Sequence, residues 1–149
     1  YLKIILIISF TALIFAYFVE HILGHQPCNL CIIERIPYGI SIILIAIIFI
    51  IKKNQKFLTL LLILTFAFSF TISIYHYGIE QGFFEESTVC SARNFTENIT
   101  KEDLLKELSK KTISCKDVTF RFFGFSLTSI NVVLSLLFII TLIKIFIKY

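Results

Sequence analysis

The chain has 149 residues, of which 57% are hydrophobic and 16% are charged, and its mean hydropathy is +0.88. Soluble domains carry roughly 25% charged residues, so this composition excludes an ordinary soluble globule. The formal net charge is +4, which raises the question of where the charges lie along the chain.

Four runs without any acidic or basic residue dominate the sequence, at residues 4–19, 36–51, 57–75 and 122–143. A membrane-spanning helix needs about 20 apolar residues, so the last two runs fit directly and the first two need flanking residues. We therefore predict an all-α integral membrane protein with one membrane domain, residues 1–149. Its spans are expected at about 3–19, 34–51, 57–77 and 122–143.

The charges between the runs predict how the chain lies in the membrane. All ten acidic residues lie between Glu20 and Asp117, whereas the two ends and the short loop after the second run carry lysines and no acid. By the positive-inside rule these lysines mark the cytoplasmic side. We expect cytoplasmic termini, a cytoplasmic loop at about 52–56, and extracytoplasmic loops at about 20–33 and 78–121. The basic balance thus indicates topology and no nucleic-acid partner.

The first outer loop ends in a CxxC motif formed by Cys28 and Cys31. Only a thiolate attacks a disulfide, and a helix N-terminus or a nearby cation lowers the thiol pKa, so this position is typical of redox-active cysteines. A helix beginning at Pro27 puts Arg35 on the same face as Cys31, where it can stabilise a thiolate or donate to a bound acceptor. Pro37 disfavours the helix here and can break that register. Alternatively, Arg35 reaches the headgroup region as an interfacial arginine.

The second outer loop holds the other two cysteines, Cys90 and Cys115, which are too far apart to form a second CxxC. They form either a static structural disulfide or a second pair that exchanges with the first. Four cysteines allow three connectivities, and the sequence does not choose among them. His76, at the outer end of the third span, can relay a proton or simply cap the helix.

Within the same loop, residues 100–103 resemble a capping box and are followed by leucines at helical spacing. They predict a short amphipathic helix. Its apolar stripe lies either along membrane lipid or inside a small packed loop domain.

Two other kinds of protein fit parts of this pattern. His21, His25, Cys28 and Cys31 follow the spacing H-x3-H-x2-C-x2-C, which suits a tetrahedral metal site in an extracytoplasmic metal-binding membrane protein. That hypothesis leaves the two loop cysteines unexplained. The other alternative is a four-span protein whose disulfides are purely structural.

Residues 27–38 contain the pattern P-C-x-L-C-x-x-x-R, residues 75–80 read Y-H-x-G-x-E, and residues 123–127 read F-G-F-S-L just before the last helix. These three segments resemble the DsbB family, bacterial inner-membrane oxidases that regenerate the disulfide of DsbA, in which the last segment reads F-L-G-L-S. The resemblance covers nearly the whole chain, although the chain has no Trp where many members carry one. Vitamin K epoxide reductase combines similar elements, but there the loop pair precedes the CxxC, whereas here the CxxC comes first.

The resemblance implies a four-helix transmembrane bundle in the bacterial inner membrane, with periplasmic cysteines and thiol:quinone oxidoreductase activity. Electrons are expected to pass from a reduced DsbA-like protein to Cys90 and Cys115, then to Cys28 and Cys31. The final acceptor is expected to be a membrane quinone, either ubiquinone or menaquinone.

The resemblance also implies individual roles. Cys90 matches the cysteine that DsbA attacks, and Cys115 matches its partner. Cys31 matches the cysteine next to the quinone, and Arg35 matches the arginine beside the quinone ring. His76 falls close to the family's quinone-proximal histidine.

Overall fold

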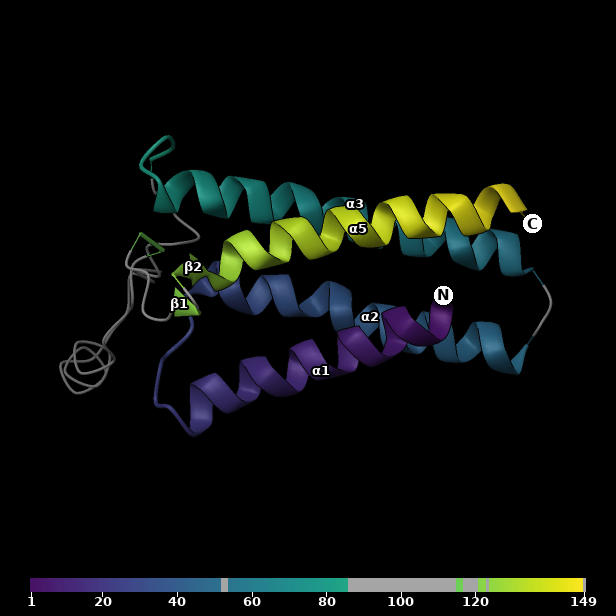
Figure 1. Ribbon diagram of the computed structural model, residues 1–149, viewed down its shortest axis with the longest axis horizontal. Helices are drawn as coiled ribbons and strands as arrows, with labels where there is room; N and C mark the ends of the chain where they lie inside the picture. The colour runs from purple at the N-terminus through teal and green to yellow at the C-terminus, as the bar shows by residue number, and fades with distance from the viewer. Residues whose placement is uncertain (52–53, 86–114, 117–120, 123, 149) are drawn as a thin grey trace, which may run out of the picture.

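The computed structural model describes residues 1–51, 54–85, 115–116, 121–122 and 124–148 (Figure 1). Four long helices make up most of this part of the chain: α1 (Leu2–His21), α2 (Asn29–Ile50), α3 (Gln55–Glu80) and α5 (Leu127–Lys148). Each is long and apolar enough to cross a membrane. The predicted all-α transmembrane bundle is therefore confirmed. The amphipathic helix expected from residue 100 onward lies outside the described residues, and so does Cys90.

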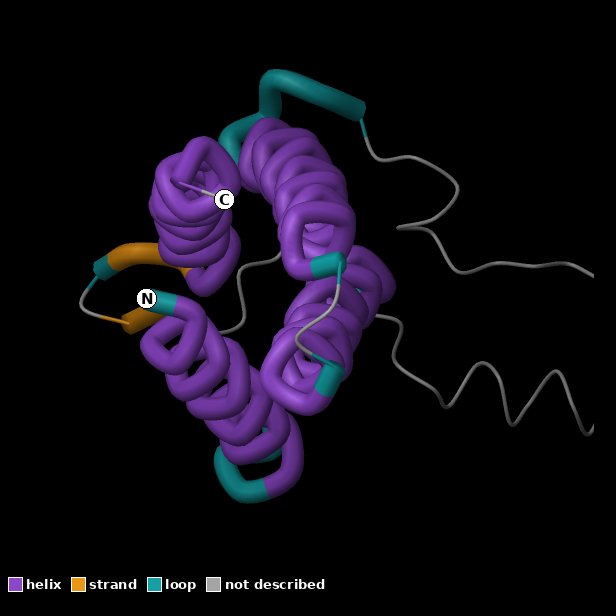
Figure 2. Tube along the Cα trace, turned by 90° about the vertical axis from the view of Figure 1, so that its right-hand side faces the viewer, coloured by secondary structure: helices purple, strands orange, loops and turns teal. Residues whose placement is uncertain are grey.

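The helices pack in a chain of neighbours, α1 on α2, α2 on α3 and α3 on α5 (Figure 2). Phe66 is fully buried in the apolar core, with its ring centroid 4.9 Å from that of Phe138. Small polar side chains face each other between helices, where they allow close approach. The hydroxyl oxygens of Ser69 and Ser135 are 3.2 Å apart. Large apolar side chains are exposed on the outer faces of all four helices, as a lipid environment requires.

The CxxC motif caps the start of α2. Cys28 is the N-cap residue in an extended conformation, and its sulfur accepts a hydrogen bond from the backbone N–H of Cys31 at 3.3 Å. Pro27 thus precedes the cap and does not occupy the first helical position. The helix runs without a break through Pro37, so the expected register between Cys31 and Arg35 is preserved.

A small hairpin precedes the last helix. Strand β1 (Arg121–Phe122) pairs antiparallel with β2 (Phe125–Ser126), and Gly124 between them has a φ of 86°, which glycine adopts without strain. The side chain of Ser126 accepts a hydrogen bond from the backbone N–H of Ser129 at 3.2 Å, as at a helix N-terminus. The hairpin explains why α5 begins at Leu127, later than the charge-free run itself.

Both chain termini lie at one end of the bundle, and the loop after α1, the end of α3 and the hairpin lie at the other (Figure 1). Cys28 and Cys115 are at this second end, which we call the cysteine end. They pack there with Leu30 and Ile79 in a cluster separate from the main core. The fold therefore gathers distant segments at one end of the bundle.

Candidate functional site

A cavity of about 520 Å³ lies at the cysteine end, within the range typical of ligand sites. Residues from all four helices line it, and α1 and α5 supply most of its apolar wall. Helix α1 packs mainly on α2 and makes few contacts with α5. The cavity is therefore not closed off by tight packing between α1 and α5. The polar and sulfur-containing groups on the wall include Cys28, Cys31, Glu34, Arg35, Tyr38, His76, Glu80, Cys115 and Asn131.

The structure brings three of the four cysteines together. The sulfur atoms of Cys28 and Cys31 are 2.7 Å apart, and both residues are free thiols. Cys115 is buried and disulfide-bonded, and its sulfur lies within 4.8 Å of the Cys28 sulfur. Cys115 is far from the CxxC motif in the sequence, but in the fold it lies close to Cys28, the first cysteine of that motif.

His76 connects this thiol to a buried carboxylate. Its Nε2 lies 3.5 Å from the Cys28 sulfur, and its Nδ1 lies 3.0 Å from Oε1 of Glu34. When Nδ1–H donates to Glu34, Nε2 faces the thiol as a proton acceptor. Cys28, His76 and Glu34 are thus arranged as a nucleophile, a base and a carboxylate that orients the base. This arrangement activates a thiol in nucleophilic catalysis.

Cys28 precedes the first helical residue of α2, and its surroundings favour the thiolate. The hydrogen bond from the Cys31 thiol lowers the pKa of Cys28 below its ordinary value, and His76 adds to this effect, while burial opposes it. In the reduced CxxC motif, the negative charge is therefore stabilised on Cys28.

Arg35 lies on the wall of the same cavity. It forms an ion pair with Glu20 at the end of α1, and its guanidinium carbon lies 5.2 Å from the centroid of the Tyr17 ring. These two contacts hold a planar cation at the rim of an apolar cavity. A guanidinium in that position can donate to a ligand oxygen that gains negative charge.

Sequence reasoning missed the buried polar groups behind His76. The amide of Asn131 donates to Oε2 of Glu34 at 3.0 Å and to the hydroxyl of Ser73 at 2.8 Å, and its oxygen accepts from the Tyr38 hydroxyl. These groups connect α2, α3 and α5. A signal was present, because Asn131 is the only amide side chain within the last charge-free run, and polar groups inside a span usually have a function or a partner.

Glu80 was also missed as a site residue. Its Oε1 accepts a hydrogen bond from the Thr128 hydroxyl at 2.6 Å and lies 3.9 Å from Nε2 of His76. Its Oε2 is buried without a hydrogen-bond partner among the described residues. One turn of α3 therefore presents both His76 and Glu80 to the cavity.

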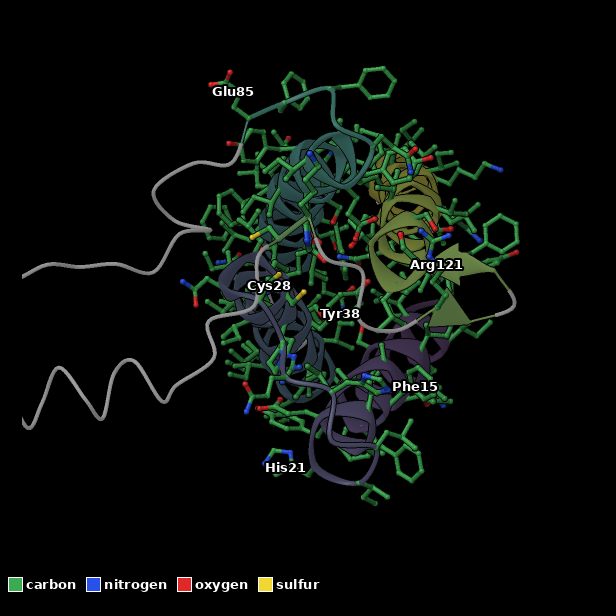
Figure 3. All side chains as sticks on the ribbon, turned by 90° about the vertical axis from the view of Figure 1, so that its left-hand side faces the viewer. Phe15, His21, Cys28, Tyr38, Glu85 and Arg121 are labelled. Carbon is green, nitrogen blue, oxygen red and sulfur yellow. The ribbon has the colours of Figure 1, made fainter. Side chains whose placement is uncertain are left out.

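The metal site suggested by the sequence spacing does not form. His21 lies at the edge of the bundle, with its Nδ1 3.2 Å from the carbonyl oxygen of Tyr17, whereas Cys28 lies near the middle (Figure 3). His21, His25, Cys28 and Cys31 do not come together as ligands. Among the described residues, the one group of three possible ligands with atoms close together is Cys28, His76 and Cys115.

Comparison with known proteins adds two findings. The family model "Disulfide bond formation protein DsbB" matches residues 1–145. An uncharacterized protein of Rickettsia prowazekii (strain Madrid E), RP370, is 30% identical over 141 residues, which cover 93% of this chain and 82% of that protein.

Proposed function

Since this chain belongs to the DsbB family, we propose that it reoxidises a DsbA-like thiol oxidoreductase and passes the electrons to a membrane quinone. The family implies disulfide bond formation at a membrane. The observation that supports the more specific reaction is the position of the Cys115 sulfur, within 4.8 Å of Cys28 on the wall of an apolar cavity. At this distance Cys115, from the partner-facing pair, can exchange with Cys28 of the CxxC motif, which lines the cavity for the lipid-soluble acceptor.

The proposed relay consists of thiol-disulfide exchanges in which electrons balance. A thiolate of the reduced partner attacks Cys90 of a Cys90–Cys115 disulfide, which forms a mixed disulfide and releases the Cys115 thiolate. That thiolate attacks Cys28 of an oxidised CxxC motif and releases Cys31. The second partner thiol then frees Cys90, which attacks Cys115 and releases Cys28. The result is an oxidised partner and a reduced CxxC motif.

The residues around the cavity fit a quinone. The wall is mainly apolar, which suits an isoprenoid-substituted ring, and it carries a few converging polar groups that can orient ring oxygens. A bound quinone supplies an acceptor for two electrons and two protons. Arg35 then donates to the oxygen that gains charge, and Cys31 is the thiol expected next to the ring.

His76 has a role in proton movement under this proposal. Its Nε2 takes the proton of the Cys28 thiol, and Glu34 at Nδ1 stabilises the resulting imidazolium. Formation of the Cys28–Cys31 disulfide then releases two electrons toward the acceptor. A strong acceptor is needed, because DsbA is itself strongly oxidising, at about −120 mV.

The proposed orientation puts the cysteine end in the periplasm of a bacterial inner membrane and both termini in the cytoplasm. Support comes from the lysines near the opposite end of the bundle. Lys3 lies in the first turn of α1, Lys56 lies in the first turn of α3, and Lys148 ends α5.

Mass-tag alkylation of the reduced full-length protein, before and after quinone is added, tests the function. Quinone-dependent loss of all four free thiols supports the oxidase. The matched control is Cys28→Ser, in which quinone must fail to oxidise the CxxC motif. Unchanged thiols in the wild-type protein would rule out the quinone reaction and favour purely structural disulfides.

A further inference from the structure

Three ligand atoms from separate parts of the chain face one another at the cysteine end. The sulfur of Cys28, a ring nitrogen of His76 and the sulfur of Cys115 all lie within 4.8 Å of each other, and all three residues are buried. The Cys28 sulfur is 3.5 Å from the histidine Nε2. Zinc bonds of about 2.3 Å to sulfur and about 2.0 Å to nitrogen put two such ligands roughly 3.5 Å apart in a tetrahedral site. The distance between Cys28 and His76 therefore already suits zinc, and Cys115 lies near enough to complete three ligands.

A second observation points to a cation at the same place. The side chain of Glu80 is 6% exposed, lines the same cavity, and keeps Oε2 buried without a hydrogen-bond partner in the described part of the chain. Burying an unsatisfied carboxylate oxygen is costly, so such an atom indicates a missing partner. The other oxygen of Glu80 is 3.9 Å from Nε2 of His76.

The surroundings of His76 are those of a metal ligand. Histidines that bind a metal through one ring nitrogen usually donate the other N–H to a carboxylate, which fixes the ring. Here Nδ1 lies 3.0 Å from Glu34, whose second oxygen accepts a hydrogen bond from Asn131. The ring is therefore held with Nε2 toward Cys28.

We propose that the fully reduced protein binds one zinc ion through Cys28, His76, Cys115 and Glu80. Two sulfurs, one imidazole and one carboxylate form a closed tetrahedral set, with Glu80 turning from Thr128 toward the ion. Cys115 is disulfide-bonded in this structure, so a dithiol or phosphine reductant must first supply two electrons and two protons to open that bond. Zinc then displaces one proton from each thiol without changing its own oxidation state.

Zinc bound in this way acts as a reversible, redox-dependent inhibitor. It holds Cys28 and Cys115 as ligands, so neither can take part in disulfide exchange. Oxidation of either cysteine pair removes a ligand, and the oxidised protein therefore releases the ion. This inference goes beyond the proposed function, because binding requires neither quinone nor a partner protein.

The test is a zinc titration of the full-length protein in detergent, without oxygen, in competition with a chelating dye. The reduced wild-type protein should take up one zinc ion, and the oxidised protein should take up none. Cys115→Ser and His76→Ala should abolish high-affinity uptake, and Glu80→Gln should weaken it by about tenfold or more. X-ray absorption should show two sulfur ligands at about 2.3 Å.

Two control variants distinguish this site from the one suggested by sequence spacing. Cys31→Ser and the double variant His21→Ala with His25→Ala should bind zinc as the wild type does. Loss of zinc in either control, or wild-type affinity in Cys115→Ser, would overturn the proposal. Cys115→Ser is the decisive variant because it leaves the buried groups behind His76 in place. The titration contains no quinone, so its failure would leave the test of oxidase activity unaffected.

Discussion

The Nε2 atom of His76 lies 3.5 Å from the sulfur of Cys28, although the two residues are 48 positions apart in the sequence. This contact joins the end of α3 to the cap of α2. The contact gives Cys28 a proton acceptor, the imidazole of His76. Cys31 instead donates a hydrogen bond to the sulfur of Cys28. The two cysteines therefore differ chemically before any ligand binds.

The first prediction concerns the pH dependence of Cys28. Its pKa is lowered by the Cys31 thiol, so in the reduced, metal-free protein the thiolate persists well below pH 8.5, the ordinary pKa of a cysteine, and disappears as the pH falls through the lowered value. The rate of alkylation of Cys28 by iodoacetamide, measured by mass spectrometry, should therefore stay high at pH 7.

Substitutions of Cys31 provide the control. Cys31→Ala removes the main cause of the shift and should move the alkylation profile of Cys28 toward that of an ordinary thiol. Cys31→Ser keeps a hydroxyl donor and should retain most of the shift. Identical profiles in the wild type and Cys31→Ala would contradict the assigned cause.

The second prediction concerns Asn131. Asn131→Leu leaves Glu34, Ser73 and Tyr38 each without one buried partner, and we expect a loss of about 1–3 kcal/mol in the free energy of unfolding. Unfolding in detergent, followed by helix content, measures this. Thr141→Ala is the matched control on the same helix, because that exposed hydroxyl donates only to its own helix, and the cost should stay below about 0.5 kcal/mol. Equal costs for the two substitutions would refute the importance of the buried groups.

The third prediction concerns Arg35. Arg35→Gln removes a charged donor from the cavity wall, and a hydrogen bond to a charged group is worth about 1.5–3 kcal/mol. We expect the KM for quinone to rise by roughly 10- to 150-fold, while all four cysteines still form disulfides. Steady-state oxidation of a reduced DsbA-like protein at varied quinone concentrations measures the change.

Lys56→Gln is a suitable control for Arg35. It removes another cation that lies over an aromatic ring, 5.2 Å from the centroid of Phe146, but at the opposite end of the bundle. Its kinetics should match those of the wild type. An unchanged KM in Arg35→Gln would remove Arg35 from the proposed quinone site.

The fourth prediction concerns the order of electron transfer. Cys115→Ala leaves Cys90 as a free thiol that cannot return to a disulfide with Cys115. On mixing with the oxidised partner protein, Cys90 should attack the partner's disulfide and displace one of its thiolates, so a covalent complex between Cys90 and the partner should accumulate. Non-reducing electrophoresis detects it. If the complex required loss of Cys31 instead, the proposed sequence of exchanges would be wrong.

The transmembrane helices could be predicted from the sequence because lipid leaves the backbone few choices. A chain in hydrocarbon must satisfy its own N–H and C=O groups, so long uncharged runs become helices. The start of α2 was harder to predict, because Glu34 and Arg35 interrupt the apolar pattern there. The structure accommodates them inside the helix through His76, Asn131 and Glu20, which come from three other helices.

The candidate site could be predicted only in its local parts. Three parts of the site can be recognised from short stretches of sequence, because each belongs to a motif of a few consecutive residues: the CxxC motif, Arg35 and His76. The approach of Cys115 to Cys28 joins two positions that are far apart in the sequence, and sequence spacing contains no measure of that distance. The same holds for Glu80, whose unsatisfied oxygen is apparent only once the helices are packed.

The limited packing between α1 and α5 has a consequence for how the two substrates of the proposed reaction would arrive. A hydrophobic acceptor can diffuse sideways within the bilayer and enter between these helices, while a water-soluble protein approaches the loops along the membrane normal. Because the two routes are at right angles, both substrates can be bound at the same time. The turnover rate of the purified protein should therefore depend on the ratio of acceptor to detergent within the micelles. It should not depend on the acceptor concentration averaged over the whole solution.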